Sequence, residues 1–133
     1  MTLITQYGEN STITNILMAH KVTAIIQART NSSSLPGKVL ADLAGRSMLA
    51  FQLERLQRCQ LIDEILLATT DQTFDDALAA LSKELNIVVV RGREHDVLSR
   101  FALAAESTTA KTLLRITGDC PLIDSQLLSY AIV

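Results

Sequence analysis

The sequence has few of the residues that build metal, disulfide and nucleic-acid sites. Its 133 residues include no Trp, and aromatic residues make up 4%, so we do not expect the stacking platforms on which single-stranded nucleic acids bind. The cysteines, Cys59 and Cys120, have no CxxC spacing, and the histidines, His20 and His95, have no metal-ligand spacing. We therefore expect reduced thiols, in a protein of the cytoplasm, and no zinc site.

Long apolar runs and an excess of positive charge are also missing. No run approaches the ~20 apolar residues of a membrane span, and residues 1–20 lack the basic start and apolar centre of a signal peptide. A net charge of -2 argues against a wide basic surface for nucleic acid. We expect no membrane or nucleic-acid partner, an N-terminal extension over 1–21 and one domain over 22–133.

What the chain does contain is a regular alternation of two patterns. Four short apolar runs rich in β-branched residues predict strands over 22–28, 64–70, 86–91 and 112–117. Each run is continuous, as in strands that are covered on both faces of a parallel sheet. Stretches with helical spacing follow them over 47–59, 74–86, 96–107 and 124–133. This alternation predicts an α/β fold with a parallel sheet between helices.

Each predicted strand is followed by a polar cluster. The four clusters read RTNSSSLPGK, TTDQTFDD, RGREHD and TGDCPLID. In open α/β sheets ligands bind beyond the carboxyl ends of the strands, so this edge is the expected site. Polar loops are common at such positions whether or not they bind a ligand, and position alone does not decide between the two interpretations.

The first cluster resembles a phosphate-binding loop without being a Walker A motif. That motif requires Gly and Ser or Thr where this chain has Ser32 and Val39. Arg29 and Lys38 nevertheless bracket a loop of hydroxyl and backbone N–H groups, and Gly37 lets the backbone approach a ligand, which suits an anion. A solvated Pro-Gly turn explains the same residues equally well.

Acidic residues in the other clusters also have two interpretations. Asp119, directly after the last predicted strand, is placed to hold Mg²⁺ against a phosphate or to bond its own turn. Asp96 and Asp124 precede predicted helices, where capping is favoured over substrate binding. Thr70 and Asp71 suit either hydrogen bonds to a nucleoside or a plain turn.

Taken in order, these segments resemble a known family. AIIQARTNSSSLPGK, IDEILLATTD, VVVRGREHDVLSRF and LLRITGDCPLID are similar to segments of the SpsF-type cytidylyltransferases of spore-coat polysaccharide biosynthesis. Those enzymes are relatives of the acylneuraminate and 3-deoxy-manno-octulosonate cytidylyltransferases. The resemblance runs from about Val22 to the end of the chain. It implies a three-layer, Rossmann-like nucleotide-diphospho-sugar transferase fold.

The resemblance also implies a reaction and a set of site residues. CMP would pass from CTP to a sugar or sugar acid, with pyrophosphate released and Mg²⁺ as the cofactor. Arg29 and Lys38 would be catalytic and face the triphosphate, and Asp119 would bind the metal. The implied nucleotide-binding residues are Ala28, Pro36, Gly37, Thr70, Asp71 and Thr117.

Two departures from the family pattern support a different interpretation. The family usually reads GSTRLPGK, whereas this chain reads NSSSLPGK, with Asn31 for the Gly and Ser34 for the Arg. Family members also continue for about as much chain again, so the resemblance implies a truncated fold with an exposed sheet edge and favours a homodimer. The alternative function is a catalytically incomplete α/β module that binds a nucleotide sugar or a partner. A third is a related nucleotidyltransferase that uses another nucleotide.

Overall fold

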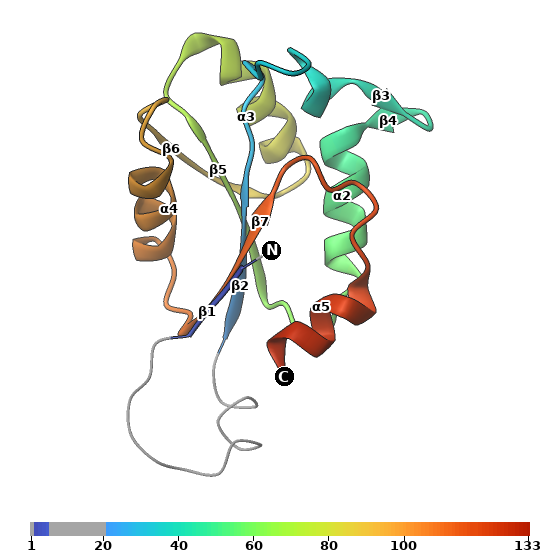
Figure 1. The fold of residues 1–133 in the computed structure, drawn as a ribbon, viewed down its shortest axis with the longest axis vertical. Coiled ribbons are helices and arrows are strands. Elements are labelled where there is room, and N and C mark those ends of the chain that lie inside the picture. The colour runs from blue at the N-terminus through green and yellow to red at the C-terminus, as the bar shows by residue number, and fades with distance from the viewer. Residues whose placement is uncertain (1, 6–20) are drawn as a thin grey trace.

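A five-stranded sheet forms the centre of the molecule in the computed structural model, which describes residues 2–5 and 21–133 (Figure 1). Its strands are β1 Thr2–Thr5, β2 Val22–Gln27, β5 Glu64–Thr70, β6 Val88–Gly92 and β7 Thr112–Thr117. They lie in the order β1-β7-β2-β5-β6. Strands β2, β5, β6 and β7 run parallel, and β1 pairs antiparallel with β7.

Helices cover both faces of this sheet. The α-helices are α2 Met48–Gln57, α3 Asp76–Glu84, α4 Val97–Glu106 and α5 Ser125–Ile132. Two 3-10 helices, η1 Lys38–Leu40 and η2 Thr73–Asp75, and a small hairpin of β3 Asp42–Leu43 and β4 Arg46–Ser47 complete the described elements. One apolar core joins α2, α3 and α5 to the sheet, and a second joins α4 to the opposite face. The predicted helix-sheet-helix layers are therefore confirmed.

Local sequence signals explain where the helices begin. The side chain of Ser47 accepts a hydrogen bond from the Ala50 amide at the start of α2. Asp96 accepts from Ser99 before α4, and Asp124 accepts from two amides before α5. These side chains satisfy amides that have no partner within the helix. The capping interpretations of Asp96 and Asp124 are thus confirmed.

The N-terminal segment contributes to the sheet in a way that the sequence patterns did not predict. Most of the expected extension, residues 1 and 6–20, lies outside the described residues. Within it, β1 pairs with β7 over four residues, from Thr2 opposite Arg115 to Thr5 opposite Thr112. This edge strand covers the side of β7 that faces away from β2. None of the described helices is long and apolar enough to cross a membrane.

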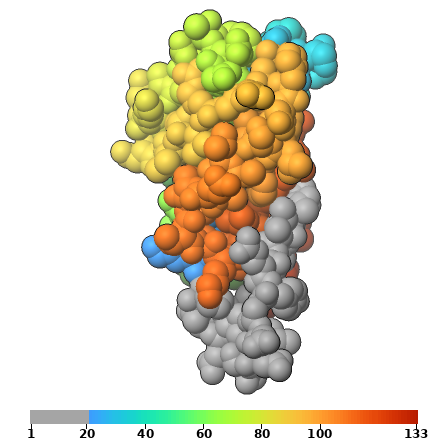
Figure 2. Space-filling view, turned by 90° about the vertical axis from the view of Figure 1, so that its left-hand side faces the viewer, coloured from blue at the N-terminus to red at the C-terminus, as the bar shows by residue number. Residues whose placement is uncertain are grey.

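The strand order reverses at β2, and this reversal positions the site. From β2 the chain moves through α2 to β5 on one side and later returns through α4 to β7 on the other side. The loops after β2 and β7 therefore leave the same edge of the sheet side by side. Such reversal points are where open α/β sheets bind ligands. Figures 1 and 2 show the loop after β2 and the turn after β5 together at one end of the molecule.

We predict that Leu66→Ala lowers the free energy of unfolding by roughly 2–5 kcal/mol, because Leu66 on β5 is fully buried in the core beneath α4 and its truncation leaves a cavity. Leu98→Ala is the matched control: this leucine, on α4, is largely exposed, and a change within about 0.5 kcal/mol is expected. Urea unfolding measures both. Equal effects of the two substitutions would contradict the assignment of the second core.

Candidate functional site

A small cleft of about 160 Å³ opens between the carboxyl ends of β2 and β7. It is lined by Gln27, Ala28, Arg29, Ser32, Lys38, Val39, Thr117, Gly118 and Asp119. We call it the phosphate cleft for the charges on its walls. Arg29 and Lys38, predicted from the first polar cluster, thus meet Asp119, predicted from the last one, at a single opening.

Lys38 and Asp119 form an ion pair across this cleft. The Lys38 Nζ lies 3.6 Å from Asp119 Oδ2, and the aspartate side chain is 51% exposed. The hydrogen bond from the Thr117 side chain and the charge of Lys38 lower the pKa of Asp119, although burial opposes them. Asp119 is therefore a carboxylate with an accessible oxygen at neutral pH, as a metal ligand requires.

Gly118 allows the two loops to come together, a role that the sequence analysis missed. Its amide donates a hydrogen bond of 2.8 Å to the carbonyl of Gln27. A Cβ atom at this position would lie 2.5 Å from the Ala28 Cβ and 3.1 Å from the Gln27 carbonyl oxygen. Only glycine fits this approach without displacement of its neighbours. The TGD order of the sequence was the available signal.

The loop after β2 is shaped by its own backbone. The carbonyl of Thr30 accepts hydrogen bonds from the amides of Ser32 and Gly37, at 3.0 and 2.7 Å. Gly37 has a φ of 74°, a left-handed conformation that glycine adopts readily, and it directly precedes η1. This turn places Lys38 on the wall of the cleft. Asn31, the substitute for the family glycine, does not need a left-handed backbone: the only described non-glycine residues with positive φ are Ala44 and Asn86.

A buried aspartate fixes the same loop to the neighbouring strand. The fully buried Asp75 accepts hydrogen bonds of 2.7 Å from both the amide and the hydroxyl of Thr30, and another from the Thr70 hydroxyl. Burial raises the pKa of Asp75, but the hydrogen bonds from Thr70 and Thr30 outweigh it, so the pKa lies below its ordinary value. In the sequence analysis Asp75 lay only within the predicted helix over 74–86 and had no role in the site.

The structure gives two other strand-end residues internal contacts. The hydroxyl of Thr70 is fully buried and donates to Asp75. This hydrogen bond does not support the predicted contact of Thr70 with a nucleotide, which stays a prediction. Arg91 donates to the carbonyls of Thr70 and Gln72 and pairs with Asp76 at 2.7 Å. Its guanidinium therefore stabilises the turn after β5 rather than facing either cleft.

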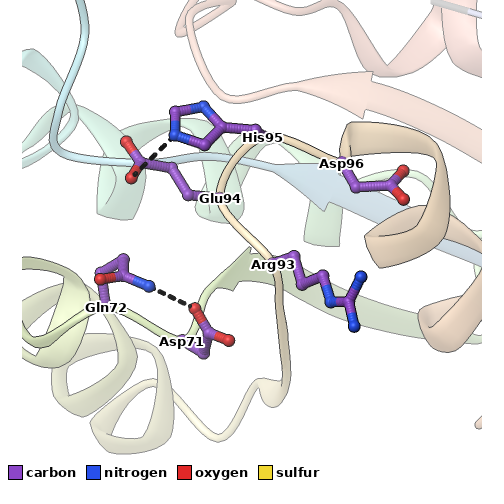
Figure 3. Close-up of a pocket in the computed structure, with 6 residues that line it drawn as sticks. All are labelled: Asp71, Gln72, Arg93, Glu94, His95 and Asp96. Atoms are coloured by element: carbon purple, nitrogen blue, oxygen red, sulfur yellow. Dashed lines mark hydrogen bonds and ion pairs between the residues drawn. The ribbon is translucent and has the colours of Figure 1, made fainter.

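A second, larger cleft of about 640 Å³ lies beside the first, at the ends of β5 and β6. Figure 3 shows its lining residues, Asp71, Gln72, Arg93, Glu94, His95 and Asp96. Asp71 and Gln72 are hydrogen bonded on one side, and Glu94 and His95 are paired on the other. We call it the wide cleft.

The predicted site residues therefore fall into three groups. Ala28, Arg29, Lys38, Thr117 and Asp119 line the phosphate cleft, and Asp71 lines the wide cleft. The third group lines neither cleft: Gly37 shapes the loop, Pro36 is exposed beside it, and Thr70 is buried against Asp75.

Comparison with known proteins decides the family. A family model described as Cytidylyltransferase matches residues 23–133. The chain belongs to the cytidylyltransferase family.

Individual relatives agree with this assignment. The spore coat polysaccharide biosynthesis protein SpsF of Bacillus subtilis is 37% identical over 112 residues, which are 81% of this chain and 47% of SpsF. The structure of a cytidylyltransferase from Leptospira borgpetersenii matches with a TM-score of 0.79 and 36% identity, over 84% of this chain and 47% of that one. A CMP:2-keto-3-deoxy-manno-octonic acid synthetase complexed with CTP matches with a TM-score of 0.70 and 27% identity, over 83% and 45%.

These matches confirm the predicted nucleotide-diphospho-sugar transferase fold and the resemblance to the SpsF and octulosonate enzymes. This cytidylyltransferase chain spans about half the length of the relatives that it matches.

The donor set of the phosphate cleft fits a magnesium ion that also binds a substrate. Asp119 is the one carboxylate that lines the cleft, and no group of three or more His, Cys, Asp or Glu side chains able to hold a metal occurs among residues 2–5 and 21–133. Mg²⁺ is commonly bound by one or two carboxylates together with water and substrate phosphates. The cleft therefore suits a metal that arrives with a phosphate ligand.

We predict that Asp75→Ala lowers the free energy of unfolding by about 3 kcal/mol, because hydrogen bonds to a charged group are worth about 1.5–3 kcal/mol each and are not additive. The folded-state pKa is lowered, so the stabilisation by Asp75 is complete above the ordinary value of 3.8 and is lost as the pH falls below it. The free energies of unfolding of wild type and variant, measured with denaturant, should thus converge in acid.

Asp76→Ala, which removes only the surface pair with Arg91, should cost less than about 1 kcal/mol. A pH-independent difference for Asp75→Ala would contradict this account.

Gly118→Ala should destabilise the protein by roughly 1–3 kcal/mol, since the added methyl group forces apart two packed backbones. Adding Ala28→Gly removes the 2.5 Å contact but leaves those with the Gln27 carbonyl oxygen, at 3.1 Å, and with the Cα of residue 28, at 3.2 Å. We therefore expect the double variant to recover part of the loss in thermal unfolding. No recovery would show that the Ala28 contact is not the source of the strain.

Proposed function

We propose that this chain is the nucleotide-binding part of an enzyme that transfers CMP from CTP to a sugar or sugar acid and releases pyrophosphate. The observation that carries the proposal is the convergence of Arg29, Lys38 and Asp119 on one cleft in a member of the cytidylyltransferase family. The similarity to SpsF supports a role in surface or spore-coat polysaccharide biosynthesis.

The phosphate cleft would bind the charged triphosphate of a nucleotide, and the wide cleft would bind its uncharged base and ribose. The phosphate cleft offers the guanidinium of Arg29 and the ammonium of Lys38 to the triphosphate, and Asp119 to a magnesium ion. The wide cleft offers the carboxylate of Asp71 and the amide of Gln72, groups that hydrogen bond to a base or ribose. Ala28 and Thr117, at the ends of β2 and β7, line the walls of the phosphate cleft.

The proposed reaction asks the protein mainly for alignment and charge. A hydroxyl group of the sugar attacks the α-phosphorus and gives up its proton to solvent. A P–O bond to the sugar forms, and the bond from the α-phosphorus to the bridging oxygen breaks, with pyrophosphate as the leaving group. Arg29 and Lys38 stabilise the negative charge that develops on the phosphate oxygens. A magnesium ion on Asp119 would supply further positive charge. Ser34 provides no cation where the family has Arg, so this loop holds one charged donor fewer.

We predict that CTP with Mg²⁺ raises the thermal stability of the wild-type chain, by roughly 2.7 kcal/mol at a hundred times the Kd. Asp119→Asn should abolish the part of the shift that depends on Mg²⁺, because it removes the carboxylate that would bind the metal. Asp42→Asn, in the β3–β4 hairpin away from the cleft, is the charge-matched control and should leave the shift unchanged.

The alternatives give different results in the same titration. A shift with UTP or GTP but none with CTP would favour a nucleotidyltransferase with another substrate. The absence of a shift with any nucleotide would favour a binding or interaction module, the alternative that Ser34 supports. Pyrophosphate release from CTP and candidate sugars, measured with the chain joined to the remainder of a relative's domain, then tests the transfer itself.

A further inference from the structure

The two clefts are separated by a contact between two side chains. Arg29 lines the phosphate cleft and Glu94 lines the wide cleft. Arg29 Nη1 lies 3.8 Å from Glu94 Oε1, so the pair stands where one cleft meets the other. A ligand with phosphates in the first cleft and a nucleoside in the second must pass this pair.

Glu94 is held more firmly than Arg29. The side chain of Glu94 is 17% exposed, and the side-chain amide of Asn31 donates to the same Oε1 at 3.3 Å. Arg100 fixes the backbone at this point: its Nη1 donates hydrogen bonds to the carbonyls of Arg93 and Glu94 at 2.5 and 2.6 Å. Arg100 is only 4% exposed and has no partner for its Nε among the described residues.

Arg29 is the more exposed member of the pair. Its side chain is 41% exposed, and its separation from Glu94 is that of an ion pair rather than of a hydrogen bond. Partly exposed ion pairs of this kind are weak enough to exchange partners. A polyphosphate, with several negative oxygens, competes for Arg29 with the single carboxylate.

We propose that Glu94 is a positioning residue that holds Arg29 between the clefts until a polyphosphate displaces it. The proposal rests on the proposed function, because it takes the phosphate cleft as the polyphosphate site. Binding then exchanges one counter-ion of Arg29 for another, and the affinity for the polyphosphate is reduced by the cost of opening the pair. Asn31, which stands where the family has Gly, strengthens the hold on Glu94.

The test uses inorganic tripolyphosphate, measured by isothermal titration calorimetry with wild type and Glu94→Gln. We expect the variant to bind about three- to tenfold more tightly, since it removes both the competing charge and its repulsion of the ligand. The difference should shrink as ionic strength rises. A purely structural residue would give the opposite sign, because its loss would weaken the site. Glu106→Gln, the same chemical change at the far end of α4, should bind like wild type.

Equal or weaker binding by Glu94→Gln overturns the inference, as does the absence of tripolyphosphate binding in both proteins. If Glu94→Gln does not fold, Asn31→Ala replaces it, and about twofold tighter binding is expected because Glu94 then holds Arg29 less firmly. CTP is titrated in parallel. Wild type that binds tripolyphosphate but no nucleotide refutes the proposed function, while the ratio between variant and wild type still decides the role of Glu94.

Discussion

The contact between Gly118 and Ala28 sets the distance between the two loops that carry the site. Parallel strands β2 and β7 end at the same edge, and their loops leave toward different elements because the chain order reverses there. With no side chain at Gly118, the backbones approach closely enough for its amide to bond the Gln27 carbonyl. Lys38 from one loop then reaches Asp119 from the other. A bulkier residue at this position separates these groups without touching either.

The loop after β2 owes its shape to buried polar bonds rather than to regular secondary structure. Asp75 receives three hydrogen bonds, two of them from Thr30, and so ties this loop to the end of β5. Gly37 then turns the chain into η1. A loop fixed in this way presents Arg29 and Lys38 with less ordering to be done when a ligand binds, which favours affinity and alignment.

Much of this arrangement was predictable from sequence, and the rest depended on distant contacts. Continuous apolar runs identified the four parallel strands, and Asp96 and Asp124 were identified as helix caps because capping is a local interaction. The polar clusters that follow the strands predicted that Arg29, Lys38 and Asp119 would lie at the same edge of the sheet. Asp75 could not be told apart from its neighbour Asp76, since the donor that distinguishes it, Thr30, is 45 residues away. β1 was missed because its partner lies about a hundred residues along the chain.

The charges of the site are balanced before any ligand binds. Arg29 faces Glu94, and Lys38 faces Asp119, so each cation of the phosphate cleft has its own carboxylate. Under the proposed function, this balance would let an acidic chain with a net charge of -2 bind a polyphosphate without a basic surface. Under the proposed function, a nucleotide alone would take the two cations and leave Asp119 facing its phosphates. A nucleotide that arrives with Mg²⁺ satisfies the phosphates, Lys38 and Asp119 together, so metal and nucleotide should each strengthen the binding of the other.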